Sequence, residues 1–128
     1  MSNASGRSKQ ILAIDDEPEI LDILRATLEP EGYTVHTFAT PEAGMAYYER
    51  HANEIDLVVL DYLMPGMSGE LVYECLQGTN ADVRVVLLTG CDDRVALKMF
   101  DHGLRGFIQK PFFLEDLKRE IKQHLETA

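Results

Sequence analysis

Short apolar runs rich in branched side chains alternate along the chain with longer segments in which apolar residues recur at helical spacing. The runs predict five strands, at residues 10–14, 34–38, 57–60, 83–88 and 106–108. Two of them, LVVL and VRVVLL, are almost continuously apolar. Such runs are typical of central parallel strands that are covered on both faces.

A helix is predicted after each of these strands. The first has Pro18 in its first turn and ends at Gly32, and the second begins at Thr40-Pro41, with Thr40 as its cap. Asp92 and Asp93 are capping candidates for the fourth. The residues expected to face inward are Ile20, Ile23, Leu24, Thr27 and Leu28 in the first helix, and Leu71, Val72, Cys75 and Leu76 in the third. In the fourth helix they are Val95, Ala96, Met99 and Phe100, and in the fifth Leu114, Leu117, Ile121 and Leu125.

Five strands in strict alternation with five helices predict an α/β fold, a right-handed doubly wound parallel sheet with helices on both faces. The 128 residues and 45% apolar content suit one domain with one core. Phe112 and Phe113 are expected to be packing residues, and Cys75 is expected in the core.

Composition narrows the function. A net charge of −10 disfavours direct contact with nucleic acid, because such contacts need clustered Lys and Arg. No apolar run approaches the ~20 residues that span a bilayer, so no membrane insertion and a cytoplasmic location are expected. Residues 1–8 are expected to be a disordered N-terminal segment or a remnant of recombinant expression. The cysteines and histidines show no metal-binding spacing.

The candidate chemistry lies where the predicted strands end. Asp15 and Asp16 follow the first strand, Asp61 the third, Thr89 the fourth and Lys110 the fifth. Ligands of such sheets bind at the carboxyl ends of the strands, so these side chains should converge. Three neighbouring carboxylates repel one another unless a cation lies among them, and oxygen ligands of this kind suit Mg²⁺. A carboxylate could then attack phosphorus, with Lys110 and Thr89 meeting the phosphoryl charge.

Four stretches carry a family resemblance: ILAIDDEPEI, LVVLDYLMPGMSGE, VVLLTG and GLRGFIQKPF. Their order and their positions at strand ends resemble response-regulator receiver domains of two-component signalling, over residues 9–125. The resemblance implies a receiver domain at residues 9–128 with a flavodoxin-like (βα)5 fold and strand order 2-1-3-4-5. GFIQKPF is more similar to the receivers of hybrid histidine kinases than to those joined to DNA-binding outputs.

The resemblance also implies roles for individual residues. Asp61 would be the phosphoacceptor, and Asp16, Asp61 and the backbone carbonyl of Leu63 would bind Mg²⁺ directly, with Asp15 binding it through water. Lys110 would pair with the phosphoryl group. Thr89 and Phe107 would form the switch, with Phe107 turning into the space that Thr89 vacates. Pro111 would follow a cis peptide bond.

The implied function is a phosphoacceptor switch and not an enzyme in the usual sense. A sensor histidine kinase or phosphotransfer protein would supply the phosphoryl group, and a downstream protein or output domain would bind the changed face, formed by helix four, strand five and helix five. Dimerisation on phosphorylation is left open. Neither Leu63 nor Cys91 can hold an attacking water, which predicts a long-lived phosphorylated form.

Three other interpretations stay open. A haloacid-dehalogenase-like phosphatase also uses an Asp nucleophile and Mg²⁺, but it places DxD after its first strand, where this chain has DDEP. A phosphorylation-independent adaptor could share the receiver fold. A flavodoxin-like flavin carrier would need a hydroxyl-rich loop in place of these carboxylates. Asp15 and Asp16, taken alone, could also be only a helix-capping cluster.

Overall fold

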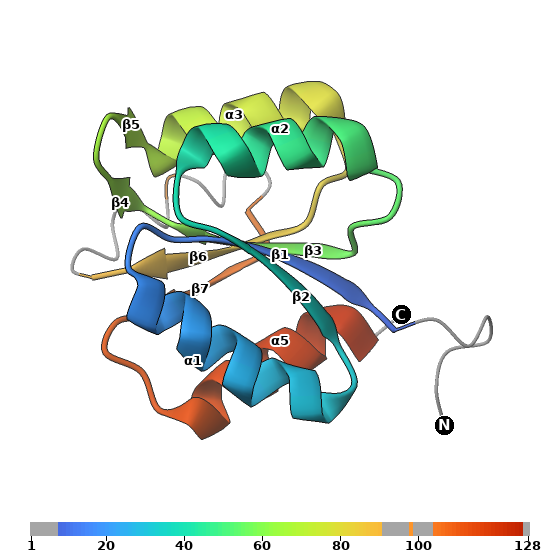
Figure 1. Ribbon diagram of the computed structural model, residues 1–128, viewed down its shortest axis with the longest axis vertical. Helices are drawn as coiled ribbons and strands as arrows, with labels where there is room; N and C mark the ends of the chain where they lie inside the picture. Colours follow the sequence, from blue (N-terminus) through green and yellow to red (C-terminus); the bar gives the residue numbers. More distant parts are fainter. Residues whose placement is uncertain (1–7, 91–97, 99–103, 127–128) are drawn as a thin grey trace.

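The computed structural model describes residues 8–90, 98 and 104–126. A five-stranded parallel sheet forms its centre, in the order β2-β1-β3-β6-β7 (Figure 1). Its strands are β1 (Gln10–Ile14), β2 (Thr34–Phe38), β3 (Leu57–Asp61), β6 (Val85–Thr89) and β7 (Gly106–Gln109). Since β6 and β7 are the fourth and fifth strands of this sheet, the predicted order 2-1-3-4-5 and the doubly wound fold are confirmed.

Helices cover both faces of the sheet. In Figure 1, α1 (Pro18–Leu28) and α5 (Leu114–Glu126) lie below it, and α2 (Pro41–His51) and α3 (Gly69–Thr79) lie above it. Successive side chains of the strands therefore enter different cores: Ile11 joins the cluster under α1 and α5, whereas Leu12 joins the cluster under α2 and α3. Burial on both faces explains why β3 and β6 are apolar at every position before their last residues, Asp61 and Thr89.

Local signals set most helix ends. Thr40 caps α2 as predicted, because its Oγ1 accepts a hydrogen bond of 3.2 Å from the amide of Ala43. Ser68 caps α3 in the same way, through the amide of Leu71. After α1 the chain makes a short 3-10 turn, Glu29–Glu31, and turns away at Gly32, whose φ of +99° favours glycine.

The orientation of α3 differs from the prediction. Leu71 and Cys75, expected to face inward, are exposed, and the buried positions are Gly69, Val72, Tyr73 and Leu76. Gly69 gives the reason: a Cβ there would lie 2.8 Å from the Cα of Tyr62, so only glycine lets the helix start this close to the chain. In this orientation Val72, Tyr73 and Leu76 face the core, and Cys75 lies on the exposed side of α3.

The exposure of some residues and the bounds of some strands also differ slightly from the prediction. Ile23 and Leu114 are more exposed than predicted, at 37% and 50%, and Leu21 is buried in place of Ile23. Strand β6 begins two residues later than expected, and β3, β6 and β7 each extend by one residue to Asp61, Thr89 and Gln109, the last residues of these strands. An unpredicted antiparallel hairpin, β4 (Leu63–Met64) with β5 (Met67–Ser68), follows Asp61.

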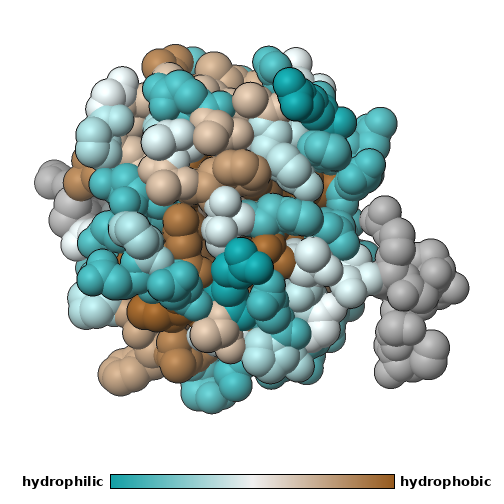
Figure 2. Space-filling view, in the orientation of Figure 1, coloured by the Kyte–Doolittle hydropathy of each residue, from teal (hydrophilic) through white to brown (hydrophobic). Residues whose placement is uncertain are grey.

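Several predictions lie outside the described residues. These are the fourth helix with its inward positions and caps, Cys91, and residues 1–7 of the N-terminal segment. Within the described part, no helix is long and apolar enough to cross a membrane. Figure 2 shows a face on which hydrophilic and apolar side chains are mixed, and some of the apolar ones lie near the start of α5, where Phe113 is 79% exposed. Phe113 is therefore not the packing residue that was expected, whereas Phe112 contacts the core.

Candidate functional site

The strand ladders bring the predicted site residues to one edge of the sheet. Asp15 directly follows β1, and its amide donates to the carbonyl of Phe38 at the end of β2 (3.1 Å). Asp61 ends β3 opposite Leu88 of β6, and Lys110 follows β7, with its amide 2.7 Å from the carbonyl of Thr89. Backbone hydrogen bonds thus hold these segments at the carboxyl edge of the sheet, as predicted.

Three carboxylates form a cluster at this edge. Asp15, Asp16 and Asp61 each offer one oxygen, and these oxygens all lie within 4.8 Å of one another. Asp15 is fully buried and Asp61 is 4% exposed. So much buried negative charge requires positive charge nearby, either from a side chain or from a cation.

Lys110 supplies the positive charge. Its Nζ lies 3.0 Å from Asp15 Oδ2, 2.9 Å from Glu17 Oε1 and 3.3 Å from Asp61 Oδ1. The other Asp15 oxygen, Oδ1, accepts a hydrogen bond of 2.9 Å from the amide of Glu17. A single ammonium therefore faces three carboxylates that come from two distant segments of the chain.

The balance of burial and charge shifts the pKa values. Burial and then the charge of Asp15 raise the pKa of Asp61 to about 7, against the opposing effect of Lys110. Burial also raises the pKa of Asp15, although the Glu17 amide and Lys110 favour its ionised form. Burial alone would lower the pKa of Lys110, but its carboxylate partners outweigh burial and raise it. Lys110 thus stays charged while the cluster remains short of positive charge.

The donor set fits a divalent cation. Asp15 Oδ2 is buried and, among the described residues, has no hydrogen bond of good geometry, although Lys110 Nζ lies close to it. An oxygen of this kind can serve as a metal ligand or can accept from metal-bound water. Hard carboxylate oxygens are the ligands that Mg²⁺ prefers.

The two predicted switch residues lie on neighbouring strands. Thr89 is 2% exposed at the end of β6, and Phe107 of β7 is half-buried against the core cluster under α2 and α3. Phe107 pairs with Leu87 and Thr89 pairs with Gln109, so the strands hold the two residues in a defined register. Thr89 and Phe107 therefore lie on the fourth and fifth strands of the predicted sheet. Their roles as a switch stay predictions.

The segment after Asp61 is shaped by the β4–β5 hairpin. Gly66 turns the chain with a φ of +85°, and the amide of Gly69 donates to the carbonyl of Tyr62 (2.9 Å). Leu63 therefore projects from a fixed loop, with 62% of its surface exposed. The peptide bond between Lys110 and Pro111 is cis, as predicted.

Glu17 is the site residue that the sequence analysis missed. The sequence assigned no role to Glu17, which follows Asp15 and Asp16 in the DDEP stretch, whereas its carboxylate makes the shortest ion pair of Lys110. Two signals were present in the sequence: the DDE triplet, and a lysine expected at the same edge of the sheet. Neither signal shows that the side chain of Glu17 reaches across to a residue 93 positions away.

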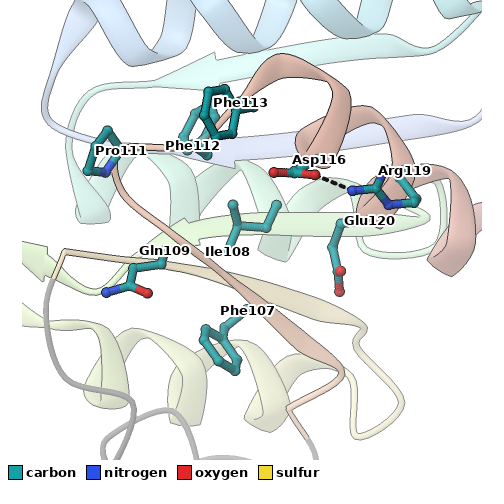
Figure 3. A pocket seen from close by; sticks show the side chains of 9 residues that line it. All are labelled: Phe107, Ile108, Gln109, Pro111, Phe112, Phe113, Asp116, Arg119 and Glu120. Carbon is teal, nitrogen blue, oxygen red and sulfur yellow. Dashed lines mark hydrogen bonds and ion pairs between the residues drawn. The ribbon is translucent and has the colours of Figure 1, made fainter.

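An open groove of about 410 Å³ lies beside the site, along β7 and the start of α5 (Figure 3). In Figure 3 an ion pair joins Asp116 to Arg119 on α5. The lining residues are Phe107, Ile108, Gln109, Pro111, Phe112, Phe113, Asp116, Arg119 and Glu120. The groove thus occupies part of the face that was predicted to change on phosphorylation.

Comparison with known proteins identifies the family. The model of the response regulator receiver domain matches residues 11–122. The transcriptional regulatory protein YvrH of Bacillus subtilis (strain 168) is 35% identical and matches 100% of this chain and 52% of its own length. The sensor kinase CckA of Brucella abortus (strain 2308) is 31% identical and matches 98% of this chain but 13% of its own length.

Solved structures agree with this result. A response regulator receiver domain protein from Clostridium thermocellum superposes with a TM-score of 0.86 at 30% identity. The match covers 91% of this chain and 94% of that one. The chain thus corresponds to nearly the whole of that solved chain, and it spans about half the length of YvrH.

Proposed function

Because the chain belongs to the response regulator receiver domain family, we propose that it is a signalling switch whose phosphoacceptor is Asp61. Receiver domains are signalling domains rather than enzymes in the usual sense. The phosphoryl donor would be the phosphohistidine of a sensor histidine kinase or phosphotransfer protein. In the transfer, a carboxylate oxygen of Asp61 bonds to phosphorus, the P–N bond breaks, and the leaving imidazole takes up a proton.

One observation carries the proposal: Asp61 is buried at the strand edge between two further aspartates and the ammonium of Lys110. Burial limits the access of water, so a carboxylate here can hold an acyl phosphate. Lys110 is already 3.3 Å from Asp61 Oδ1, close enough to pair with an oxygen of the attached phosphoryl group. Thr89, at the end of the neighbouring strand, would donate its hydroxyl to another.

Receiver domains bind Mg²⁺ at acidic residues, and the carboxylate cluster fits that ion. We assign Asp16, Asp61 and the backbone carbonyl of Leu63 as direct ligands, and Asp15 as a ligand through water. Bound Mg²⁺ would neutralise the carboxylates and the phosphoryl oxygens. The residues of this chain would orient the acceptor, exclude water and hold Lys110.

The output would be a shift between two conformations. Phosphorylation biases this equilibrium only by as much as the phosphoryl group interacts better with one state, through Thr89 and Lys110. Phe107 would turn inward as Thr89 moves, and this would change the face formed by the fourth helix, β7 and α5. The groove of Figure 3 lies on this face and would be remodelled with it.

The wider context is proposed on the same basis. Residues 9–128 would form the receiver unit, and its partner after phosphorylation would be a downstream protein or an output domain. The relatives include a sensor kinase and a transcriptional regulatory protein, so the likeness to hybrid kinases stays a prediction.

Intact mass measured after incubation with acetyl phosphate and Mg²⁺ tests the function. The wild type should gain the mass of one phosphoryl group, and Asp61→Asn should gain none, because the amide keeps the volume of the side chain and removes the nucleophile. No gain in the wild type would favour the phosphorylation-independent adaptor. Steady hydrolysis of phosphate monoesters would favour the phosphatase interpretation.

A further inference from the structure

The contacts of Glu17 single it out among the acidic residues near the site. Glu17 is the N-cap residue of α1, and its side chain makes no capping hydrogen bond to the first turn of the helix. Its carboxylate instead lies 2.9 Å from Lys110 Nζ. Figure 1 shows that the start of α1 lies beside the segment that links β7 to α5.

Carboxylates surround Lys110 in this arrangement: its Nζ donates hydrogen bonds to Glu17 and Asp61 and lies 3.0 Å from Asp15 Oδ2. An ammonium carries three N–H groups, and three carboxylate oxygens lie within 3.3 Å of Nζ. A phosphoryl group on Asp61 would bring new oxygens with more negative charge. A phosphoryl oxygen that pairs with Lys110 therefore competes with these carboxylates for the ammonium.

Burial decides which partner is released most easily. Asp15 is fully buried, and separating it from Lys110 would leave a carboxylate without water or a counter-ion, which is strongly unfavourable. Asp61 would carry the phosphoryl group itself, so it would stay next to Lys110. The side chain of Glu17 is 54% exposed, so water can solvate its carboxylate at once.

We propose that Glu17 is a positioning residue that holds Lys110 in the unphosphorylated domain and exchanges it for a phosphoryl oxygen when Asp61 is phosphorylated. This inference rests on the proposed function of Asp61. The Glu17–Lys110 pair competes with the phosphoryl group, so it stabilises the inactive state. Loss of the pair should shift the equilibrium toward the activated state.

The test uses beryllofluoride, a non-covalent analogue of the phosphoryl group, with the full chain in Mg²⁺ and NMR as the readout. Glu17→Gln should bind it about threefold to fivefold more tightly than the wild type, which is the range that a partly exposed ion pair supplies. Glu19→Gln is the matched control. Glu19 lies in the first turn of the same helix and is exposed, and the change removes the same charge without touching Lys110.

Glu17→Asp separates contact from charge. The shorter side chain keeps the negative charge but withdraws the carboxylate from Lys110, so its affinity should move toward that of Glu17→Gln. Equal affinities of Glu17→Gln and Glu19→Gln would overturn the inference. So would a Glu17→Asp variant that binds like the wild type while Glu17→Gln binds more tightly, because charge alone would then explain the effect.

The ammonium signal of Lys110 gives a second readout that a purely structural role would not move. Without ligand, the Nζ shift of Lys110 should differ between the wild type and Glu17→Gln. With beryllofluoride the two shifts should converge, because Lys110 has then left Glu17. Shifts that differ equally in both states would overturn the inference, and a wild type that does not bind beryllofluoride would overturn the proposed function itself.

Discussion

The polar and charged side chains at the two edges of the sheet are paired differently. At the amino edge, Asp56 Oδ2 accepts from the Gln10 amide (2.7 Å), Arg84 donates to the carbonyl of His124 (3.1 Å), and Tyr33 donates to Glu126 (2.6 Å). At the carboxyl edge, one ammonium serves three carboxylates, and a buried oxygen of Asp15 has no well-formed hydrogen bond among the described residues. At the amino edge each of these polar groups has a partner, whereas at the carboxyl edge the carboxylates outnumber the positive charges.

This difference suggests how stability and function divide within the fold. Two of the amino-edge contacts, from Arg84 and Tyr33, join the end of α5 to other segments of the chain, and the third joins Asp56 to the start of β1. The carboxyl-edge cluster costs stability while its carboxylates are ionised together. That cost would be relieved when a cation or a phosphoryl group adds the missing interactions, so the binding free energy is coupled to conformation.

The largest expected effect is on stability against pH in the absence of divalent cations. The folded-state pKa of Asp61 is about 7, above the ordinary aspartate value of 3.8, so between these pH values the folded state binds more protons than the unfolded state. Stability should therefore rise as the pH falls from 8 to 5, by about 2 kcal/mol. Urea denaturation with EDTA present measures this change.

Asp61→Asn is the control for this titration. The variant should be more stable than the wild type at pH 8 and should lose most of the pH dependence that Asp61 causes. The difference between the two proteins cancels other groups, such as His36, whose lowered pKa acts in the opposite direction. If stability depended on pH equally in both proteins, Asp61 would not be the residue with the raised pKa.

Mg²⁺ should have the next largest effect. Binding only to the folded state at ten times the dissociation constant stabilises by about 1.4 kcal/mol, seen as a rise in Tm at pH 8. Asp16→Asn should reduce this rise, because it removes one carboxylate from the cluster. An equal rise in Tm in both proteins would show that Mg²⁺ binds elsewhere. The lack of positive charge at the carboxyl edge would then not be explained by a metal site.

The next prediction concerns Leu63, which is close in sequence to Asp61, and the lifetime of the phosphorylated form. Leu63 is 62% exposed beside Asp61 and cannot orient an attacking water. Leu63→Asn should speed dephosphorylation by up to about tenfold, which corresponds to about 1.4 kcal/mol of better water placement. Decay of the phosphorylated mass after removal of acetyl phosphate gives the rate. A rate unchanged from the wild type would mean that Leu63 does not set the lifetime.

The smallest effect is expected at the amino edge. Tyr33→Phe removes the hydroxyl that donates to Glu126 and should cost about 1 kcal/mol of stability, because that hydrogen bond is partly exposed. Phosphorylation by acetyl phosphate should proceed at the wild-type rate. A slower reaction in this variant would show that the two edges are coupled, against the division drawn here.

Sequence alone determined the order of the elements and the residues that end the strands. The alternation of apolar runs and helical spacing predicted the parallel sheet, because strand and helix periods are local properties. The same topology implied that Asp15, Asp61, Thr89 and Lys110 meet, since parallel strands end at one edge. The caps at Thr40 and Gly32 were predicted for the same local reason.

Tertiary structure decided what depends on distant neighbours. The rotation of α3, which exposes Leu71 and Cys75, goes with the close approach of Gly69 to Tyr62. The raised pKa of Asp61 needs burial together with Asp15, and the role of Glu17 needs its side chain to meet Lys110 from across the fold. Periodicity is written along the chain, but burial and charge pairing depend on packing between segments far apart in it, so they could be established only from the folded molecule.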